Sequence, residues 1–208
     1  MSTTSRLRRT GRIVTGAVIV VIVSALVAVA AVTVLAVRVH GHSMEPTLRD
    51  DQRLLIDFTV EGGDVRRFDI VQTRPDAASP PIIKRVIGLP GDAVRIVPRD
   101  SRTAEVRVRP AGSDRWHVVR NPAWTNWNGR GLPCCGPDGR QGRESTPAVV
   151  PPGRLWLLGD NAGHSDDSRK YGFTDASLVS GRAWLVVWPL ADRGGVAGRV
   201  RLEPLAGP

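Results

Sequence analysis

Lysine is nearly absent from this chain: only two of its 29 Lys and Arg residues are lysines, Lys84 and Lys170. The many arginines are interleaved with Asp and Glu and form no basic stripe with aromatic stacking residues, which argues against nucleic-acid binding. Because a guanidinium does not deprotonate in proteins, a lysine kept in an arginine-rich chain is a candidate for proton-transfer chemistry.

Cysteine is equally scarce, and Cys134 and Cys135 are adjacent in "LPCCGPDG". No histidine or acidic residue accompanies them at ligand spacing, so the sequence predicts no zinc site, and neither a metal nor a cofactor is expected. Outside the cytosol the pair could form a vicinal disulfide, an intermolecular bridge or no bond. We favour a local feature of a loop.

Charge is missing from residues 13–37, an apolar run of 25 residues. As a helix this run would be about 37 Å long, against about 30 Å of bilayer hydrocarbon. The alternative is a cleaved secretory signal, but its apolar core is only about 7 to 15 residues long. The run therefore predicts a single transmembrane helix.

The N-terminal arm, residues 1–12, carries four arginines, and no acidic residue precedes Glu45. The positive-inside rule then places the arm in the cytoplasm, where it can attract anionic lipid headgroups. Everything from Arg38 onward should be extracytoplasmic. The predicted location is the plasma membrane, with one span.

Long helical periodicity is absent after residue 40, and short β-branched or aromatic segments separated by Gly, Pro or Asp take its place. We expect a mostly β, antiparallel domain over residues 38–190, with a looser insertion at about 98–150 and a C-terminal tail at 191–208. The predicted strands are residues 52–58, 68–73, 81–88, 93–97, 104–110, 115–119, 154–159 and 182–188.

Two separated segments carry candidate catalytic groups. Ser43 lies in "GHSMEPTL", where on these residues alone a serine that caps a turn is the commoner case. Lys84 lies in "PIIKRVIGLPGD" and should share a strand face with Ile82 and Val86. Burial would lower the lysine pKa and make the neutral amine available as a base. The alternative is a surface lysine whose stem covers a sheet edge.

A third segment, "LLGDNAGHSDDSRKYGFT" at residues 157–174, follows a predicted strand and is densely polar. It could be a solvated turn with an Asp–Arg ion pair. Beside a serine and a lysine, its hydroxyls could instead orient the amine while its carboxylates and Arg169 brace the loop.

Together, "SMEPTL", "KRVIGLPGD" and "GDNAGHSDDSRKYG" resemble, in this order, the signature boxes of bacterial type I signal peptidases, membrane-bound serine proteases with a Ser/Lys dyad. "RRFDIVQT" is a looser match to a fourth box, with Phe68 where the family usually has glycine. The resemblance covers about residues 13–190. It implies that Ser43 is the nucleophile, that Lys84 is the general base and that Ser165 hydrogen-bonds the lysine.

The resemblance also implies two supporting ion pairs, Asp160 with Arg85 and Asp167 with Arg169. Small apolar pockets would select Ala-x-Ala before the cut by excluding bulky side chains. The residues implied around these pockets are Val39, Met44, Leu48, Ile82 and Ile83. The implied partners are exported preproteins and the lipid bilayer, and a secretion translocon is a further candidate.

One position departs from the Gram-negative pattern, in which a serine two residues before the nucleophile helps to bind the oxyanion. Gly41 stands there, as is usual in Gram-positive members, so the oxyanion hole would use the Ser43 N–H with the Gly41 backbone or a water. His42 and His164 suggest a rival serine–histidine site, which adjacency and position in the loop disfavour.

Two other functions stay open from the sequence. One is another Ser/Lys processing protease of the same fold, such as a self-cleaving repressor, although no DNA-binding module is present. The other is a catalytically inactive, membrane-tethered binding module, against which the intact Ser43, Lys84 and Ser165 argue. Trp156, Trp184 and Trp188 are equally compatible with a packed core and with an interfacial belt.

Overall fold

The computed structural model describes residues 14–27, 29–30, 36–101, 103–124, 133–196 and 198–205 of the 208. The chain separates into two units, residues 1–36 and residues 37–208. In the first unit, residues 14–27 and 29–30 are helical. Within the described ranges, no helix combines the length and apolarity that crossing a membrane requires. The arm 1–12 and residues 13, 28 and 31–35 of the predicted span lie outside them.

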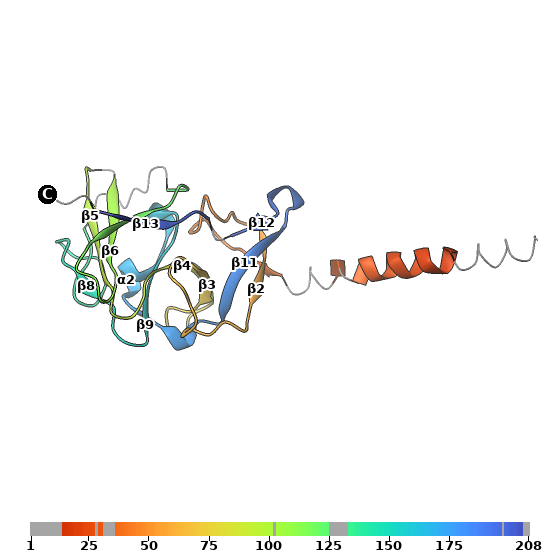
Figure 1. The fold of residues 1–208 in the computed structure, drawn as a ribbon, viewed down its shortest axis with the longest axis horizontal. Coiled ribbons are helices and arrows are strands. Elements are labelled where there is room, and N and C mark those ends of the chain that lie inside the picture. The colour runs from red at the N-terminus through yellow and green to blue at the C-terminus, as the bar shows by residue number, and fades with distance from the viewer. Residues whose placement is uncertain are drawn as a thin grey trace, which may run out of the picture. The chain divides into compact units, whose positions relative to one another are not determined.

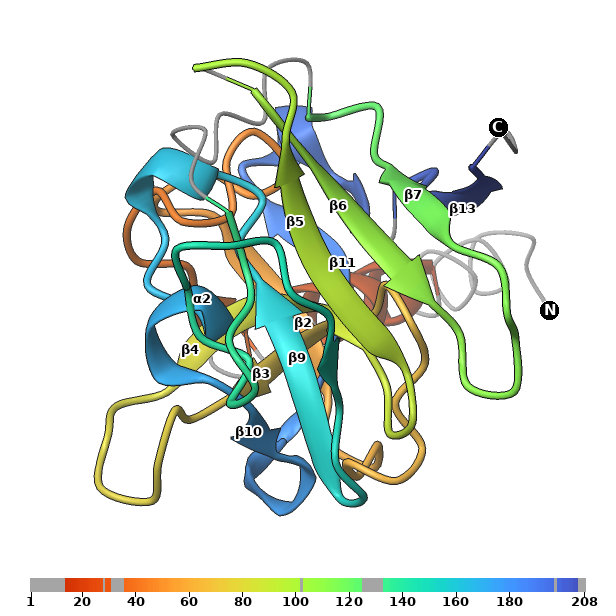
Figure 2. The same cartoon turned by 90° about the vertical axis from the view of Figure 1, so that its left-hand side faces the viewer.

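The second unit is built on two antiparallel sheets, as the sequence predicts (Figures 1 and 2). The first has eight strands in the order β1-β2-β11-β3-β4-β9-β10, with β12 paired to β11. Its strands are β1 (Val37–Arg38), β2 (Arg53–Asp57), β3 (Ile70–Thr73), β4 (Ile82–Gly88), β9 (Arg154–Leu158), β10 (Thr174–Asp175), β11 (Gly181–Trp188) and β12 (Gly194–Gly195). Val37, predicted as the end of the helix, therefore begins a strand.

The second sheet has five strands in the order β13-β7-β6-β5-β8, and Figure 2 shows β13, β7, β6 and β5 side by side. They are β5 (Ala93–Pro98), β6 (Ala104–Arg109), β7 (His117–Arg120), β8 (Ala148–Val149) and β13 (Arg201–Pro204). β6 and β7 lie within residues 98–150, where the sequence predicted two strands in a looser insertion, and alternating valines such as Val106 and Val108 pack into a shared core. β13 lies within residues 191–208, predicted as a C-terminal tail, and pairs with β7.

Alternating side chains divide the core around the first sheet. On β3, Ile70 packs into one apolar cluster and Val71 into another. On β9, Leu155 and Leu157 join the cluster of Val71, whereas Trp156 packs into a third cluster that the second sheet covers. This two-residue period is what a strand buried on both faces requires.

The remaining short elements are η1 (Ala162–His164), α2 (Ser168–Tyr171), η2 (Ala176–Leu178) and η3 (Leu190–Asp192). η1 and α2 belong to the polar loop that follows β9. β4 lies between β3 and β9, so this loop starts beside the strand that carries Lys84.

Cys134 and Cys135 form a disulfide with each other. Both are buried in the core cluster under the second sheet, and Cys134 bridges Ile96 on β5 to Gln141. Of the three states open from the sequence, the structure thus has the vicinal disulfide, within a local loop.

The tryptophans divide between core and surface. Trp156 is fully buried and its indole donates to the carbonyl of Gly139, whereas Trp184 and Trp188 are 50% and 54% exposed. The core interpretation thus applies to Trp156 alone.

Candidate active site

Ser43 lies in the turn between β1 and β2. Met44 and Leu48, the apolar residues of that turn, are buried and anchor it to the core. On the other side, the carbonyl of Ser43 accepts a hydrogen bond of 3.0 Å from the backbone N–H of Asn161. The turn is therefore fixed both to the core and to the polar loop after β9.

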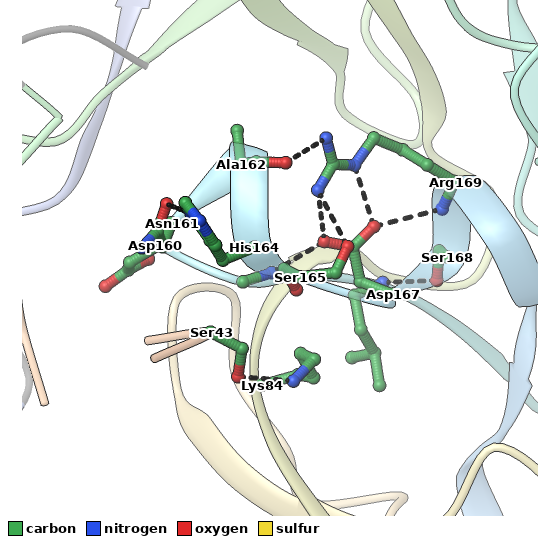
Figure 3. Close-up of polar contacts among 12 residues, drawn as sticks. Ser43, Lys84, Asp160, Asn161, Ala162, His164, Ser165, Asp167, Ser168 and Arg169 are labelled. Atoms are coloured by element: carbon green, nitrogen blue, oxygen red, sulfur yellow. Dashed lines mark hydrogen bonds and ion pairs between the residues drawn. The ribbon is translucent and has the colours of Figure 1, made fainter. Parts of the chain in front are cut away.

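Lys84 points from β4 toward this turn (Figure 3). Its Nζ lies 2.8 Å from the Oγ of Ser43 and 3.1 Å from the carbonyl of Ile83, and the residue is only 3% exposed. Burial lowers the pKa of the Lys84 amine; the charges of Asp167 and Asp166 oppose this effect and that of Arg169 adds to it. The inward, desolvated position predicted from the strand pattern is confirmed.

Ser165 borders a cleft together with Ser43 and Lys84, but the predicted hydrogen bond to Lys84 is wrong. Its Oγ is buried without a hydrogen-bond partner among the described residues, and the hydrogen bonds of the Lys84 Nζ go to Ser43 and Ile83. Gly159 makes the close packing here feasible. A Cβ on Gly159 would lie 2.1 Å from the Ser165 Oγ and 2.4 Å from the Ser43 carbonyl oxygen.

Asp167 and Arg169 form the predicted ion pair. Arg169 donates from Nε and Nη2 to the two carboxylate oxygens of Asp167, at 2.8 and 2.7 Å. Its Nη1 also donates a hydrogen bond to the carbonyl of Ala162. Asp167 accepts a further hydrogen bond from the backbone N–H of Gly159. Figure 3 shows how these contacts fold the loop back on itself above Ser43 and Lys84.

The second predicted pair, Arg85 with Asp160, is confirmed and has additional partners. Arg85 donates to both oxygens of Asp160, at 2.9 and 2.7 Å. Thr47 donates its hydroxyl to the same carboxylate, and the indole of Trp124 donates at 3.1 Å. Sequence reasoning missed Thr47, although it lies inside the "SMEPTL" box, and missed Trp124, which no motif marks.

Phe68 contributes a backbone acceptor to this network, at the position where the chain departs from the family pattern. Its carbonyl accepts a hydrogen bond of 2.9 Å from Arg85. Its φ is 75°, in the left-handed region that favours glycine. The glycine usual at this position would adopt that backbone without strain.

The side chains of the two histidines of the rival site contact residues other than Ser43. His42 pairs with Glu45, and His164 contacts the side chain of Asn161. The hydroxyl of Ser43 has Lys84 as its partner instead. Gly41 does not supply an oxyanion donor, because its N–H is bound to Asp50 at 2.8 Å.

A cleft of about 780 Å³ passes over Ser43 and Lys84. Of the five predicted pocket residues only Ile82 borders it. Val39, Met44 and Leu48 are buried in the core beneath, and Ile83 packs partly against them. Sequence reasoning missed Gln141, which borders the cleft from a segment without a motif.

Comparison with known proteins identifies this arrangement. The family model described as signal peptidase, peptidase S26, matches residues 11–188. The chain belongs to the signal peptidase family. It is thus a serine peptidase, a hydrolase, and the membership expected from the sequence boxes is confirmed.

Curated relatives in this family cover most of the length of the chain. Signal peptidase I of Streptococcus pneumoniae is 31% identical over 185 residues, which cover 76% of this chain and 84% of that protein. Signal peptidase I of Bacillus licheniformis is 33% identical, covering 74% and 76%. Mitochondrial inner membrane protease subunit 1 of Xenopus tropicalis is 33% identical, covering 74% and 69%.

Among solved structures, a signal peptidase I from Enterococcus faecalis is 26% identical to this chain. The match covers 57% of this chain and 95% of that one, with a TM-score of 0.34.

Proposed function

We propose that this chain is a membrane-anchored endopeptidase that removes signal peptides from exported preproteins, with Ser43 as nucleophile and Lys84 as general base. The observation that carries the proposal is the distance of 2.8 Å between the Lys84 Nζ and the Ser43 Oγ, inside a buried setting. A nucleophile within hydrogen-bond reach of a base with a lowered pKa is the arrangement that covalent catalysis requires.

The chemistry starts from the neutral amine of Lys84. It takes the hydroxyl proton of Ser43 as the Oγ bonds to the scissile carbonyl carbon, and then gives that proton to the leaving amine as the C–N bond breaks. The result is an ester between Ser43 and the signal peptide. Lys84 then takes a proton from a water that attacks this ester, and Ser43 recovers its proton as the ester bond breaks.

The developing oxyanion requires a donor fixed in place. The backbone N–H of Ser43 is the proposed donor, since the N–H of Gly41 already binds Asp50. The carbonyl of Ser43 is bound to Asn161, which holds the orientation of this peptide segment. In other proteases, losing one such donor costs about 2.7 to 4 kcal/mol.

Specificity for small residues before the cut, in the pattern Ala-x-Ala, is the proposed effect of the packed apolar side chains beside the serine. Ile82 borders the cleft together with Lys84, and the turn residues Met44 and Leu48 are buried in the core. A large side chain would have to displace this packed core, so rejection is steric.

The part of the apolar run that precedes β1 is the proposed membrane anchor, with the arm 1–12 in the cytoplasm and the catalytic unit outside the plasma membrane. Its support is the absence of charge over 25 residues and the helical residues 14–27 and 29–30. The exposed indoles of Trp184 and Trp188 are suited to the lipid interface. The anchored enzyme would then meet a translocating preprotein at the membrane, beside its translocon, where the effective concentration of the substrate is high.

The test uses the full chain in detergent with a preprotein whose signal ends in Ala-x-Ala. We expect wild type and Lys170→Arg to cleave it at that site, and Ser43→Ala and Lys84→Arg to be inactive while folded. Lys170→Arg is the matched control, because it removes the other lysine. Cleavage that survives Lys84→Arg would exclude the proposed mechanism, and an inactive wild type would favour the tethered binding module.

A further inference from the structure

The border of the cleft combines different chemistry. Ile82 supplies an apolar side chain, whereas Asp166, Lys170, Tyr171 and Gln141 supply polar groups. Asp166 and Lys170 form an ion pair of 2.6 Å, and their side chains are 62% and 59% exposed. A peptide that lies along the cleft therefore meets both an apolar and a polar part.

Gln141 reaches the cleft from a segment that is held rigidly. Its backbone N–H donates to the carbonyl of Arg169 at 2.8 Å, and it bridges to Cys134. Cys134 is fully buried, disulfide-bonded to Cys135 and paired with Ile96 on the second sheet. Between Cys134 and Gln141 in the chain, the carbonyl of Gly139 accepts a hydrogen bond from the buried indole N–H of Trp156.

The side chain of Gln141 is placed differently from its backbone. The residue is exposed and borders the cleft together with Ser43 and Lys84. A carboxamide offers both a donor and an acceptor, which is what the backbone of an extended peptide can pair with. The neutral amide of Gln141, on a fixed backbone, can therefore hydrogen-bond a bound substrate.

We propose that Gln141 is a specificity-determining residue that contacts the preprotein on the mature side of the cut. This inference rests on the proposed function. We place the small apolar residues of the signal against Ile82, so that the chain beyond the scissile bond meets the polar residues that border the cleft. There Gln141 faces the residues that become the new N-terminus.

The neutrality of Gln141 gives a direct way to test this contact. A charge placed at position 141 would attract opposite charges and repel like charges on the bound peptide. Pairs of exposed charges change an equilibrium by about 0.2 to 1 kcal/mol, so a change of about 1.4- to fivefold in kcat/KM is expected. A residue that only supports the fold would lower cleavage of every substrate alike.

The experiment uses the full chain and peptides that are identical up to the cut, with Ala, Glu or Lys at one of the first three positions after it. Wild type, Gln141→Lys and Gln141→Glu are compared. Glu144→Lys is the control, because Glu144 is exposed on the same segment but does not border the cleft. Relative kcat/KM values for the peptides are the readout.

We expect Gln141→Lys to favour the Glu peptide and Gln141→Glu to favour the Lys peptide, while Glu144→Lys keeps the wild-type ranking. If both Gln141 variants keep that ranking, or lose activity equally on all peptides, Gln141 is not a specificity residue although the peptidase assignment stands. If wild type cleaves none of the peptides, the proposed function fails and this inference fails with it.

Discussion

Arg85 and Asp160 form a bidentate ion pair in which both side chains are completely buried. Arg85 follows Lys84 on β4. Asp160 accepts a hydrogen bond from the hydroxyl of Thr47, which lies in the turn of Ser43. One carboxylate therefore connects the strand of the proposed base to the turn of the proposed nucleophile. The relative position of the two reactive atoms depends on it.

Asp160→Asn should be strongly destabilising. It leaves the guanidinium of Arg85 buried without its counter-charge, and breaking a buried pair by removing one partner costs about 3 to 5 kcal/mol. Denaturant unfolding of the folded unit measures this loss. Asp166→Asn, which breaks the exposed pair with Lys170, should hardly move the unfolding midpoint. Equal losses in the two variants would contradict the importance of burial.

Thr47→Val should lower kcat more than it changes KM. The valine keeps the volume of threonine but cannot donate the hydrogen bond that Asp160 accepts from the threonine hydroxyl. The turn of Ser43 is then less well aligned with Lys84. A hydrogen bond to a charged group contributes about 1.5 to 3 kcal/mol. Thr47→Ser, which keeps the hydroxyl, should restore most of kcat. A serine variant as slow as the valine variant would contradict this role.

The pH dependence of cleavage should report Lys84. Burial lowers the pKa of its amine, and only the neutral amine can accept the proton of Ser43. We therefore expect kcat/KM to rise with pH through an apparent pKa below the value of about 10.4 for a free lysine. Peptide cleavage measured across this range tests the expectation. A profile whose midpoint equals that of free lysine would exclude a desolvated base.

Lys84→Met should be more stable than wild type near pH 7, with a difference that shrinks as pH rises. Because the pKa of Lys84 is lower in the folded state, the unfolded chain binds this proton more tightly. Between the two pKa values, wild-type stability rises with pH, by at most about 1.4 kcal/mol per unit. Unfolding curves of both proteins at several pH values measure the difference. A difference independent of pH would contradict the assignment.

The residues of the candidate site were largely predictable, because they occur in short boxes. The resemblance of these boxes to a known family implied Ser43, Lys84 and the two Asp–Arg pairs, whereas residue type alone left each of them open. The geometry of Ser165 was not, because the direction of a hydroxyl depends on the packing around it. The buried position of Met44 beneath the turn, rather than at a pocket wall, likewise depends on the assembled core.

Features that depend on distant pairing escaped prediction. Trp124 and Gln141 come from a segment without motifs, and contacts such as that between Cys134 and Ile96 fix its path. β13 is only four residues long and ends in proline, so its pairing with β7 leaves little trace in the local sequence. The second sheet forms because its strands share one core, which no single strand reveals.

The scarcity of lysine gives this protein an internal spectroscopic reference. Isotopic labelling of lysine alone would give two side-chain signals, one from the buried Lys84 and one from the exposed Lys170. Burial lowers the pKa of the first, and a hydrogen bond to Asp166 raises that of the second. A single titration would therefore display the two amines moving apart, with each serving as the standard for the other.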